Sequence, residues 1–101
     1  MERRYTSFKE FYPFYLSEHS NRTCRRLHFI GSLLVLLTIG YALVTSRWLA
    51  LFALPVIGYG FAWAGHFFFE KNRPATFTYP LYSFMGDWVM FKNILTGKLK
   101  F

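Results

Sequence analysis

Two long uncharged stretches constrain the fold of this chain more than any other feature. They run from Phe29 to Ser46 and from Trp48 to Phe69, and only Arg47 separates them. About 20 consecutive apolar residues are enough for a helix to cross a lipid bilayer. With 101 residues, the chain has room for one small domain. The sequence therefore predicts an all-α integral membrane protein whose two transmembrane helices form an antiparallel hairpin.

The hairpin is expected to be flanked by two shorter helices within a single membrane domain, residues 1–101. An aromatic stripe at helical spacing precedes the hairpin, and a short apolar segment interrupted by Asp87 follows it. Both are too short or too polar to cross a bilayer, so we expect them at its interface. The predicted segments are an amphipathic helix over 6–19, transmembrane helices over 22–45 and 48–70, and an interfacial helix over 80–95.

The basic residues flank the apolar stretches. The net charge is +7, but the lysines and arginines form no single run of the kind typical of nucleic-acid binding. Basic residues are dense before the first apolar stretch and after the second, whereas the turn carries only Arg47. Because lysine and arginine favour the cytoplasmic side of a membrane, both termini are predicted to be cytoplasmic. The same side chains could also bind anionic lipid headgroups.

Histidines and a glutamate lie at the open end of the predicted hairpin. His28 lies about 18 residues before the turn and His66 about 19 after it, so the two have nearly equal depth in an antiparallel pair. Glu70 follows His66 by one helical turn and would share its face. His19 ends the amphipathic stripe and could fold over the same opening. Three imidazoles and a carboxylate are thus expected to converge.

This group of side chains is typical of a transition-metal site. Neutral imidazoles with a carboxylate and open coordination positions suit non-haem Fe(II), and ionisable groups in membrane segments often mark functional sites. The alternative is a hydrogen bond between His66 and Glu70 without a metal. Haem is disfavoured because the chain has no C-x-x-C-H motif. Asp87 could be a further ligand, a hydrogen-bond partner of a ligating histidine, or a salt-bridge partner of Arg73 or Lys71.

Two stretches of the chain resemble a known family. They are FYPFYLSEHSNRTCRRLHFIGSLL and WAGHFFFEKNRPATFTYPLYS. They are similar to a family of small membrane proteins that includes the 2-hydroxy-fatty-acid dioxygenases of fatty-acid α-oxidation. The resemblance covers about residues 8–91, and its motif residues are His19, Asn21, His28, Gly31, Gly65, His66, Glu70, Lys71, Asn72, Pro74 and Ala75.

The resemblance implies an Fe(II)-dependent enzyme that uses O₂ to shorten a 2-hydroxy acid by one carbon. By position, its metal ligands would be His19, His28 and His66. Glu70 and Asp87 are the candidate catalytic carboxylates, and the acyl chain would lie along the apolar hairpin. The candidate substrate-binding residues are Arg25, Arg26, Lys71, Asn72 and Arg73, although each of the four basic residues could instead serve topology or lipid binding.

A second hypothesis comes from a different class of protein. In it, the chain is a non-enzymatic membrane protein whose histidines and basic loops bind lipid headgroups or a partner subunit. The two hypotheses differ in metal content, because the oxygenase needs about one iron per chain. The expected partners of the oxygenase are a lipid or fatty-acid substrate, O₂ and the bilayer, with no nucleic acid and with an oligomer allowed.

Overall fold

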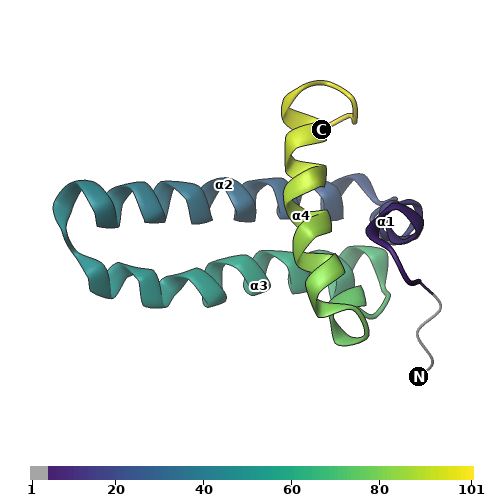
Figure 1. Ribbon diagram of the computed structural model, residues 1–101, viewed down its shortest axis with the longest axis horizontal. Helices are drawn as coiled ribbons and strands as arrows, with labels where there is room; N and C mark the ends of the chain where they lie inside the picture. Colours follow the sequence, from purple (N-terminus) through teal and green to yellow (C-terminus); the bar gives the residue numbers. More distant parts are fainter. Residues whose placement is uncertain (1–4) are drawn as a thin grey trace.

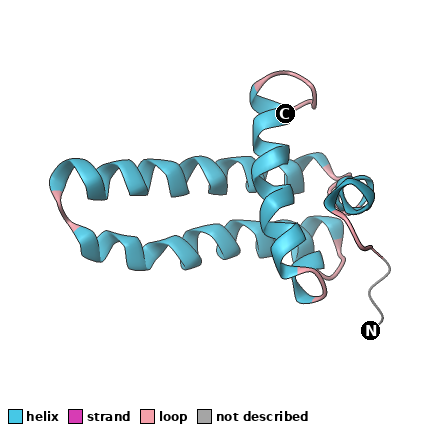
Figure 2. Cartoon of the chain, in the orientation of Figure 1, coloured by secondary structure: helices cyan, strands magenta, loops and turns pink. Residues whose placement is uncertain are grey.

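Helices make up all the regular secondary structure of residues 5–101, the part of the chain that this computed structural model describes (Figure 2). The prediction of an all-α fold is confirmed. In chain order the elements are α1 (Phe8–Ser17), α2 (Arg22–Thr45), the 3₁₀ helix η1 (Trp48–Ala53), α3 (Leu54–Ala64), the π-helical segment η2 (Gly65–Glu70), the 3₁₀ turn η3 (Ala75–Phe77) and α4 (Pro80–Leu95).

Local side-chain chemistry explains where the first two helices begin. Ser7 caps α1, because its hydroxyl accepts a hydrogen bond from the Glu10 backbone N–H at 3.2 Å. Asn21 caps α2 in the same way through the Cys24 N–H at 3.1 Å. α1 continues through Pro13 and ends at Ser17. His19 therefore lies in the linker between the two helices, just beyond α1.

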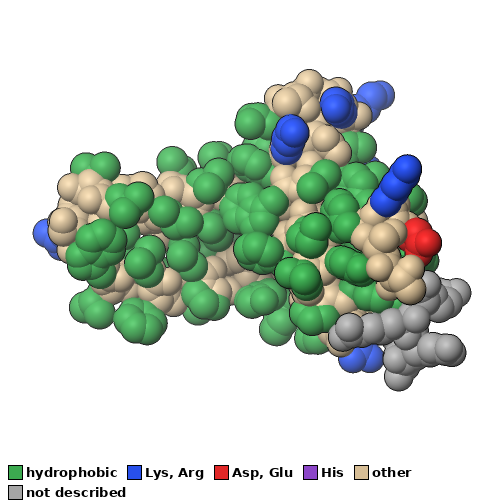
Figure 3. Space-filling model, in the orientation of Figure 1, with side chains coloured by type: hydrophobic (Ala, Val, Ile, Leu, Met, Phe, Trp, Pro, Cys, Tyr) green, Lys and Arg blue, Asp and Glu red, His purple; other side chains and the backbone are tan. Residues whose placement is uncertain are grey.

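The two long apolar segments run side by side in opposite directions (Figure 1). Ser46, at φ 57°, ends α2 in the left-handed conformation and begins the turn. The most apolar 18-residue windows within Arg22–Thr45 and Trp48–Glu70 have mean hydropathies of 2.1 and 1.5, and only 17% and 6% of these windows are buried. The core helix of a soluble protein would be mostly buried. This outward-facing apolar surface indicates association with a membrane (Figure 3).

The second apolar segment changes its helical geometry twice. It begins as the 3₁₀ helix η1 and becomes α-helical at Leu54, where Pro55 occupies the first turn of α3. Proline is tolerated there because the first N–H groups of a helix have no partner within it. The segment ends as the π-helical η2, which contains His66. Single π-helical turns are frequent at functional sites.

The two short helices cover the open end of the hairpin. α4 crosses α2 and α3, and α1 packs against α4 at the same end (Figure 1). Phe29 of α2 stacks on Phe91 of α4, with ring centroids 4.7 Å apart. A mostly aromatic cluster holds α1 to α4, and its buried members are Phe11, Tyr15, Tyr79, Met90 and Ile94. Beyond this cap, the hairpin extends as a pair of largely exposed apolar helices.

Two glycines allow the close contacts around this end. A Cβ atom on Gly65 would lie 2.9 Å from the Cys24 Sγ and 3.1 Å from the Cys24 Cα, so η2 lies directly against α2. A Cβ atom on Gly86 would lie 2.9 Å from the Tyr15 ring, where α4 meets α1. At both glycines, these distances are shorter than the usual contact distance between non-bonded atoms. Glycine is therefore required at both positions for the helices to approach as they do.

The Gly65→Ala variant is expected to be destabilised by about 1–3 kcal/mol, because the added methyl group forces η2 away from the α2 backbone. Thermal unfolding in detergent micelles measures this loss. Gly60→Ala is the matched control in the same apolar segment, since nothing lies within 4 Å of its added Cβ. Equal unfolding temperatures for the two variants would show that the close contact at Gly65 is not required.

Candidate metal centre

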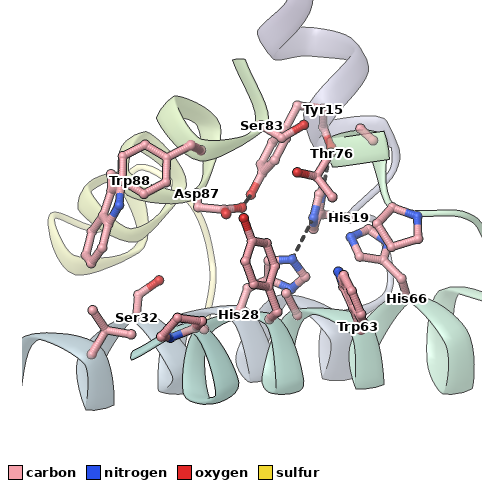
Figure 4. A pocket seen from close by; sticks show the side chains of 18 of the residues that line it. Tyr15, His19, His28, Ser32, Trp63, His66, Thr76, Ser83, Asp87 and Trp88 are labelled. Atoms are coloured by element: carbon pink, nitrogen blue, oxygen red, sulfur yellow. Dashed lines mark hydrogen bonds between the residues drawn. The ribbon is translucent and has the colours of Figure 1, made fainter. Parts of the chain in front are cut away.

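Three buried histidines come together at the capped end of the hairpin. His19 comes from the α1–α2 linker, His28 from α2 and His66 from η2, and one ring nitrogen of each lies within 4.8 Å of the other two. Their ring centroids are 4.3, 4.5 and 5.0 Å apart. Figure 4 shows the three imidazoles at one end of a cavity. The expectation that these residues converge therefore agrees with the structure.

The Nδ1 atom of every histidine in this group is hydrogen-bonded to an oxygen. The bonds join His19 to the Tyr15 carbonyl at 2.6 Å, His28 to the Cys24 carbonyl at 3.1 Å and His66 to the Asn72 side-chain oxygen at 2.7 Å. A carbonyl oxygen only accepts, so each Nδ1 carries the proton. Each Nε2 then has a free lone pair. This is how metal-binding histidines are usually oriented by their neighbours.

The closest pair of these nitrogens fits a metal ion. The Nε2 atoms of His19 and His28 are 3.0 Å apart, and neither carries a proton to share. Two facing lone pairs repel each other unless a cation lies between them. Two nitrogens bound at right angles to one ion, each at about 2.1 Å, also lie about 3.0 Å apart. The donor set of three neutral imidazoles therefore fits a divalent transition metal.

His19 is neutral, as a metal ligand must be. Its burial, together with the charges that His28 and His66 would carry, holds the pKa of His19 well below its usual value. Its ring also stacks on Tyr15, with centroids 4.0 Å apart. Because ligands must bind the metal in deprotonated form, this environment prepares His19 to do so at neutral pH.

Asn72 connects two of the histidines through its side chain. Its oxygen accepts the bond from His66, and its nitrogen donates to the Glu18 carbonyl at 3.2 Å, next to His19. Arg25 holds the same linker by donating to the His19 carbonyl at 3.3 Å. The predicted substrate-binding role of Asn72 stays a prediction, and its bonds in the structure orient His66 and the linker. That is the role of an outer-shell residue at a metal site.

The carboxylate of Glu70 is engaged with the α1–α2 linker. It accepts hydrogen bonds from the Asn21 backbone N–H and from the Ser20 hydroxyl. The sequence also allowed a hydrogen bond between His66 and Glu70. In the structure the Nδ1 atom of His66 is bonded to Asn72 instead. Among residues 5–101, the candidate ligand group contains three histidines and no carboxylate. Glu70 thus holds the linker against η2, and its catalytic role stays a prediction.

Asp87 is partly buried on α4 and lines the cavity. The Tyr15 hydroxyl donates a hydrogen bond to its carboxylate (Figure 4). Burial raises the pKa of Asp87 to about 7, although the bond from Tyr15 lowers it in part. Arg73, one of its expected salt-bridge partners, instead places its guanidinium 5.0 Å from the ring centroid of Phe77. Asp87 is therefore a carboxyl group able to exchange a proton near neutral pH.

A cavity of about 340 Å³ extends from the histidines along the hairpin. Its α2 wall is formed by residues one turn apart, which are His28, Ser32, Val35 and Ile39. Its α3 wall is apolar and includes Gly58 at its middle. Figure 4 places Trp88 of α4 on one side of the cavity. The space is therefore long, mainly apolar and polar only near the histidines, as ligand sites commonly are.

The basic candidate substrate residues lie outside the cavity lining. Arg25 donates to the Lys100 carbonyl at 3.2 Å, and Arg26 donates to the Phe101 carbonyl at 3.2 Å. These arginines thus hold the C-terminal segment against the start of α2. The candidates not among the lining residues are Arg25, Arg26, Lys71, Asn72 and Arg73. Their part in attracting an anionic substrate to the protein stays a prediction.

Several lining residues escaped the sequence analysis. Tyr15, Ser32 and Ser83 all contribute polar groups to the cavity wall. Helical spacing could have indicated two of them, because Tyr15 precedes His19 by four residues and Ser32 follows His28 by four. Ser83 precedes the candidate Asp87 by four residues, but only the crossing of α4 over the hairpin brings both to the cavity.

Residues 5–99 match a protein family described as 2-hydroxy-palmitic acid dioxygenase Mpo1-like. The chain belongs to this family. The match covers almost the whole chain, and it confirms the resemblance noted in the sequence. Comparison with curated proteins and with solved structures gives no match. The three buried histidines described above form a group that could hold a metal ion.

The Asn72→Ala variant is expected to bind metal about 10–100-fold more weakly, because His66 loses the partner that fixes its orientation. Anaerobic titration of the purified protein with Fe(II) measures the affinity. Asn93→Ala is the matched control, since the Asn93 side chain donates to the Tyr12 hydroxyl at 2.9 Å, between α1 and α4. Unchanged affinity in Asn72→Ala would contradict an orienting role for this side chain.

Proposed function

We propose that this protein is an Fe(II)-dependent membrane dioxygenase that shortens 2-hydroxy fatty acids by one carbon. The observation that carries the proposal is the convergence of three buried imidazoles, from His19, His28 and His66, whose Nδ1 atoms are all bonded to oxygens. Membership in a family described as a 2-hydroxy-palmitic acid dioxygenase supports the reaction class. The long apolar cavity that begins at these histidines supports a fatty-acid substrate.

In this proposal the hairpin of α2 and α3 spans the bilayer, and α1 and α4 lie at the interface on the side of the histidines. Lys and Arg side chains gather mainly at this end of the molecule (Figure 3), which supports a cytoplasmic position for both termini. The substrate would then reach the cavity directly from the membrane. Trp63 and Phe84, which line the cavity, are partly exposed to the outside.

His19, His28 and His66 would hold the metal as neutral ligands. Bound Fe(II) would supply the electrons that activate O₂ and would polarise the carboxylate and 2-hydroxyl oxygens of the acid. The hydrogen bonds from Nδ1 keep the three rings in place. The aromatic cap of α1 and α4 excludes water from this end of the cavity.

The acyl chain is proposed to lie in the cavity along the hairpin. From His28 to Ile39 the α2 wall is about 16 Å long, at 1.5 Å per residue. An extended saturated chain advances about 1.25 Å per carbon, from a bond length of about 1.5 Å. The wall therefore accommodates about 13 carbons beyond the polar end. This length suits a long-chain acid whose reacting carbon lies beside the histidines.

The overall reaction balances without a further reductant. One 2-hydroxy acid and one O₂ give the acid one carbon shorter, one CO₂ and one water. The acid loses four electrons and O₂ gains four, while the bond between the first and second carbons breaks. The carboxyl group of Asp87, whose pKa burial raises to about 7, is placed to accept the proton of the 2-hydroxyl group.

Metal content and O₂ consumption test the proposed function together. Protein purified in detergent without oxygen is expected to hold about one iron per chain and to convert 2-hydroxyhexadecanoic acid to pentadecanoic acid. His66→Ala is expected to lose the iron and the activity, because one of three ligands is missing. Gly60→Ala controls for folding, since its Cβ meets open space. Protein that binds no metal even when Fe(II) is supplied would favour the lipid-binding or partner-binding alternative.

Substitution of Gly58 is expected to shorten the acyl chain that the protein accepts. Gly58 lines the cavity, and a Cβ atom there fits at 3.8 Å from a Val35 methyl group, so Gly58→Leu extends into the space for the chain. The ratio of kcat/KM for 16-carbon over 10-carbon acids should fall at least about tenfold. Gly60→Leu, on the exposed side of α3, is the matched control. An equal ratio in Gly58→Leu and Gly60→Leu would mean that the acyl chain lies outside this part of the cavity.

A further inference from the structure

Ser83 presents a buried hydroxyl group that has no hydrogen-bond partner. Its residue is 5% exposed, and its Oγ is the one buried side-chain atom left unpaired among residues 5–101. Ser83 also lines the cavity that begins at the histidines. A buried hydroxyl without a partner is unfavourable, and such atoms are rare in folded proteins. Its presence needs an explanation beyond packing.

Three threonines in or at the end of helices form a bond that Ser83 does not form. Serine and threonine within a helix commonly bond to the carbonyl four residues back. Thr38, Thr45 and Thr96 do so here, at 2.8, 2.7 and 2.9 Å. The Ser83 backbone N–H bonds to the Tyr79 carbonyl at 2.9 Å, but its hydroxyl stays free at the cavity wall. The hydroxyl is therefore available to a bound molecule.

The residues around Ser83 suit the carboxylate end of a bound acid. Ser83 precedes Asp87 by four residues, so the two side chains are neighbours on one face of α4. The Tyr15 hydroxyl is already committed to Asp87, which leaves Ser83 as the free donor beside it (Figure 4). No lysine or arginine is among the lining residues. A carboxylate in this cavity therefore depends on neutral donors for its hydrogen bonds.

We propose that the Ser83 hydroxyl donates a hydrogen bond to the carboxylate of the bound fatty acid. The acid's identity rests on the proposed function, whereas the contact itself rests on the unpaired hydroxyl. The carboxylate and the 2-hydroxyl sit on adjacent carbons, and Ser83 and Asp87 are adjacent on α4. With Ser83 at the carboxylate and Asp87 at the 2-hydroxyl, the second carbon faces the histidines. Ser83 is thus a substrate-binding residue that sets the direction of the acid in the cavity.

Ligand titration of the Ser83→Ala variant tests this contact. The fluorescence of Trp63 and Trp88, which line the cavity, reports binding in purified protein kept without oxygen. Hexadecanoic acid and 2-hydroxyhexadecanoic acid are expected to bind at least about tenfold more weakly, as for a lost hydrogen bond to a charged group. Hexadecane, which has the chain but no polar end, should bind as it does to the wild type. Unchanged affinity for the acids, or equal weakening for all three ligands, would overturn the proposal.

Stability provides an independent measurement on the same variant. Ser83→Ala removes an unpaired buried hydroxyl, so the ligand-free variant is expected to unfold at the same temperature as the wild type or a higher one. Thr96→Ala, which removes a paired hydroxyl at the end of α4, should leave acid binding unchanged. A purely structural role for Ser83 would instead lower the unfolding temperature of Ser83→Ala, and that outcome would also overturn the proposal.

The two proposals can fail separately. Acid binding that depends on Ser83 in a protein without iron or O₂ consumption would overturn the dioxygenase and retain the carboxylate contact. Iron binding and chain shortening with normal acid affinity in Ser83→Ala would retain the dioxygenase and overturn the contact. Iron content measured on Ser83→Ala itself separates a lost ligand contact from a damaged metal centre.

Discussion

Three buried imidazole rings from three different elements meet at one end of the hairpin, with the Nε2 atoms of His19 and His28 facing each other, and the rest of the structure is arranged around this meeting. Unprotonated nitrogens 3.0 Å apart repel, so the arrangement needs firm support. That support comes from the oxygen bonded to each Nδ1 atom and from Glu70 and Arg25, which hold the linker that carries His19. Under the proposed function, a bound cation would relieve the repulsion between these acceptors and would couple the fold of this end to the metal.

The hairpin and the cap of α1 and α4 form different parts of the site. Close contact between η2 and α2, possible because Gly65 has no side chain, sets the distance between His28 and His66. The cap of α1 and α4 closes the polar end, while the apolar cavity continues along the hairpin. The cavity therefore has two kinds of surface in separate parts: hydroxyl and carboxyl groups near the histidines, and apolar walls farther along.

Helical spacing predicted much of this protein because its elements are long and strongly apolar. Counting outward from Arg47 was enough to put His28 and His66 at the same depth, since both helices rise by the same distance per residue. Spacing was less informative for Glu70, whose expected place beside His66 assumed an α-helix where the chain forms a π-helical segment. Glu70 instead bonds to the linker. The arginines at the start of α2 were equally undetermined, because long flexible side chains reach partners that are distant in sequence.

The sequence by itself determined the all-helical class, the apolar segments, the family and the three candidate ligands, because hydrophobic periodicity and motif spacing are local properties. Tertiary structure alone decided which nitrogen of each histidine is free, which residues line the cavity, and that the Ser83 hydroxyl is left without a partner. These features depend on the crossing of α4 over the hairpin and on contacts between residues up to 81 positions apart, such as Tyr12 with Asn93. No local pattern encodes them, because they arise only when separate helices pack.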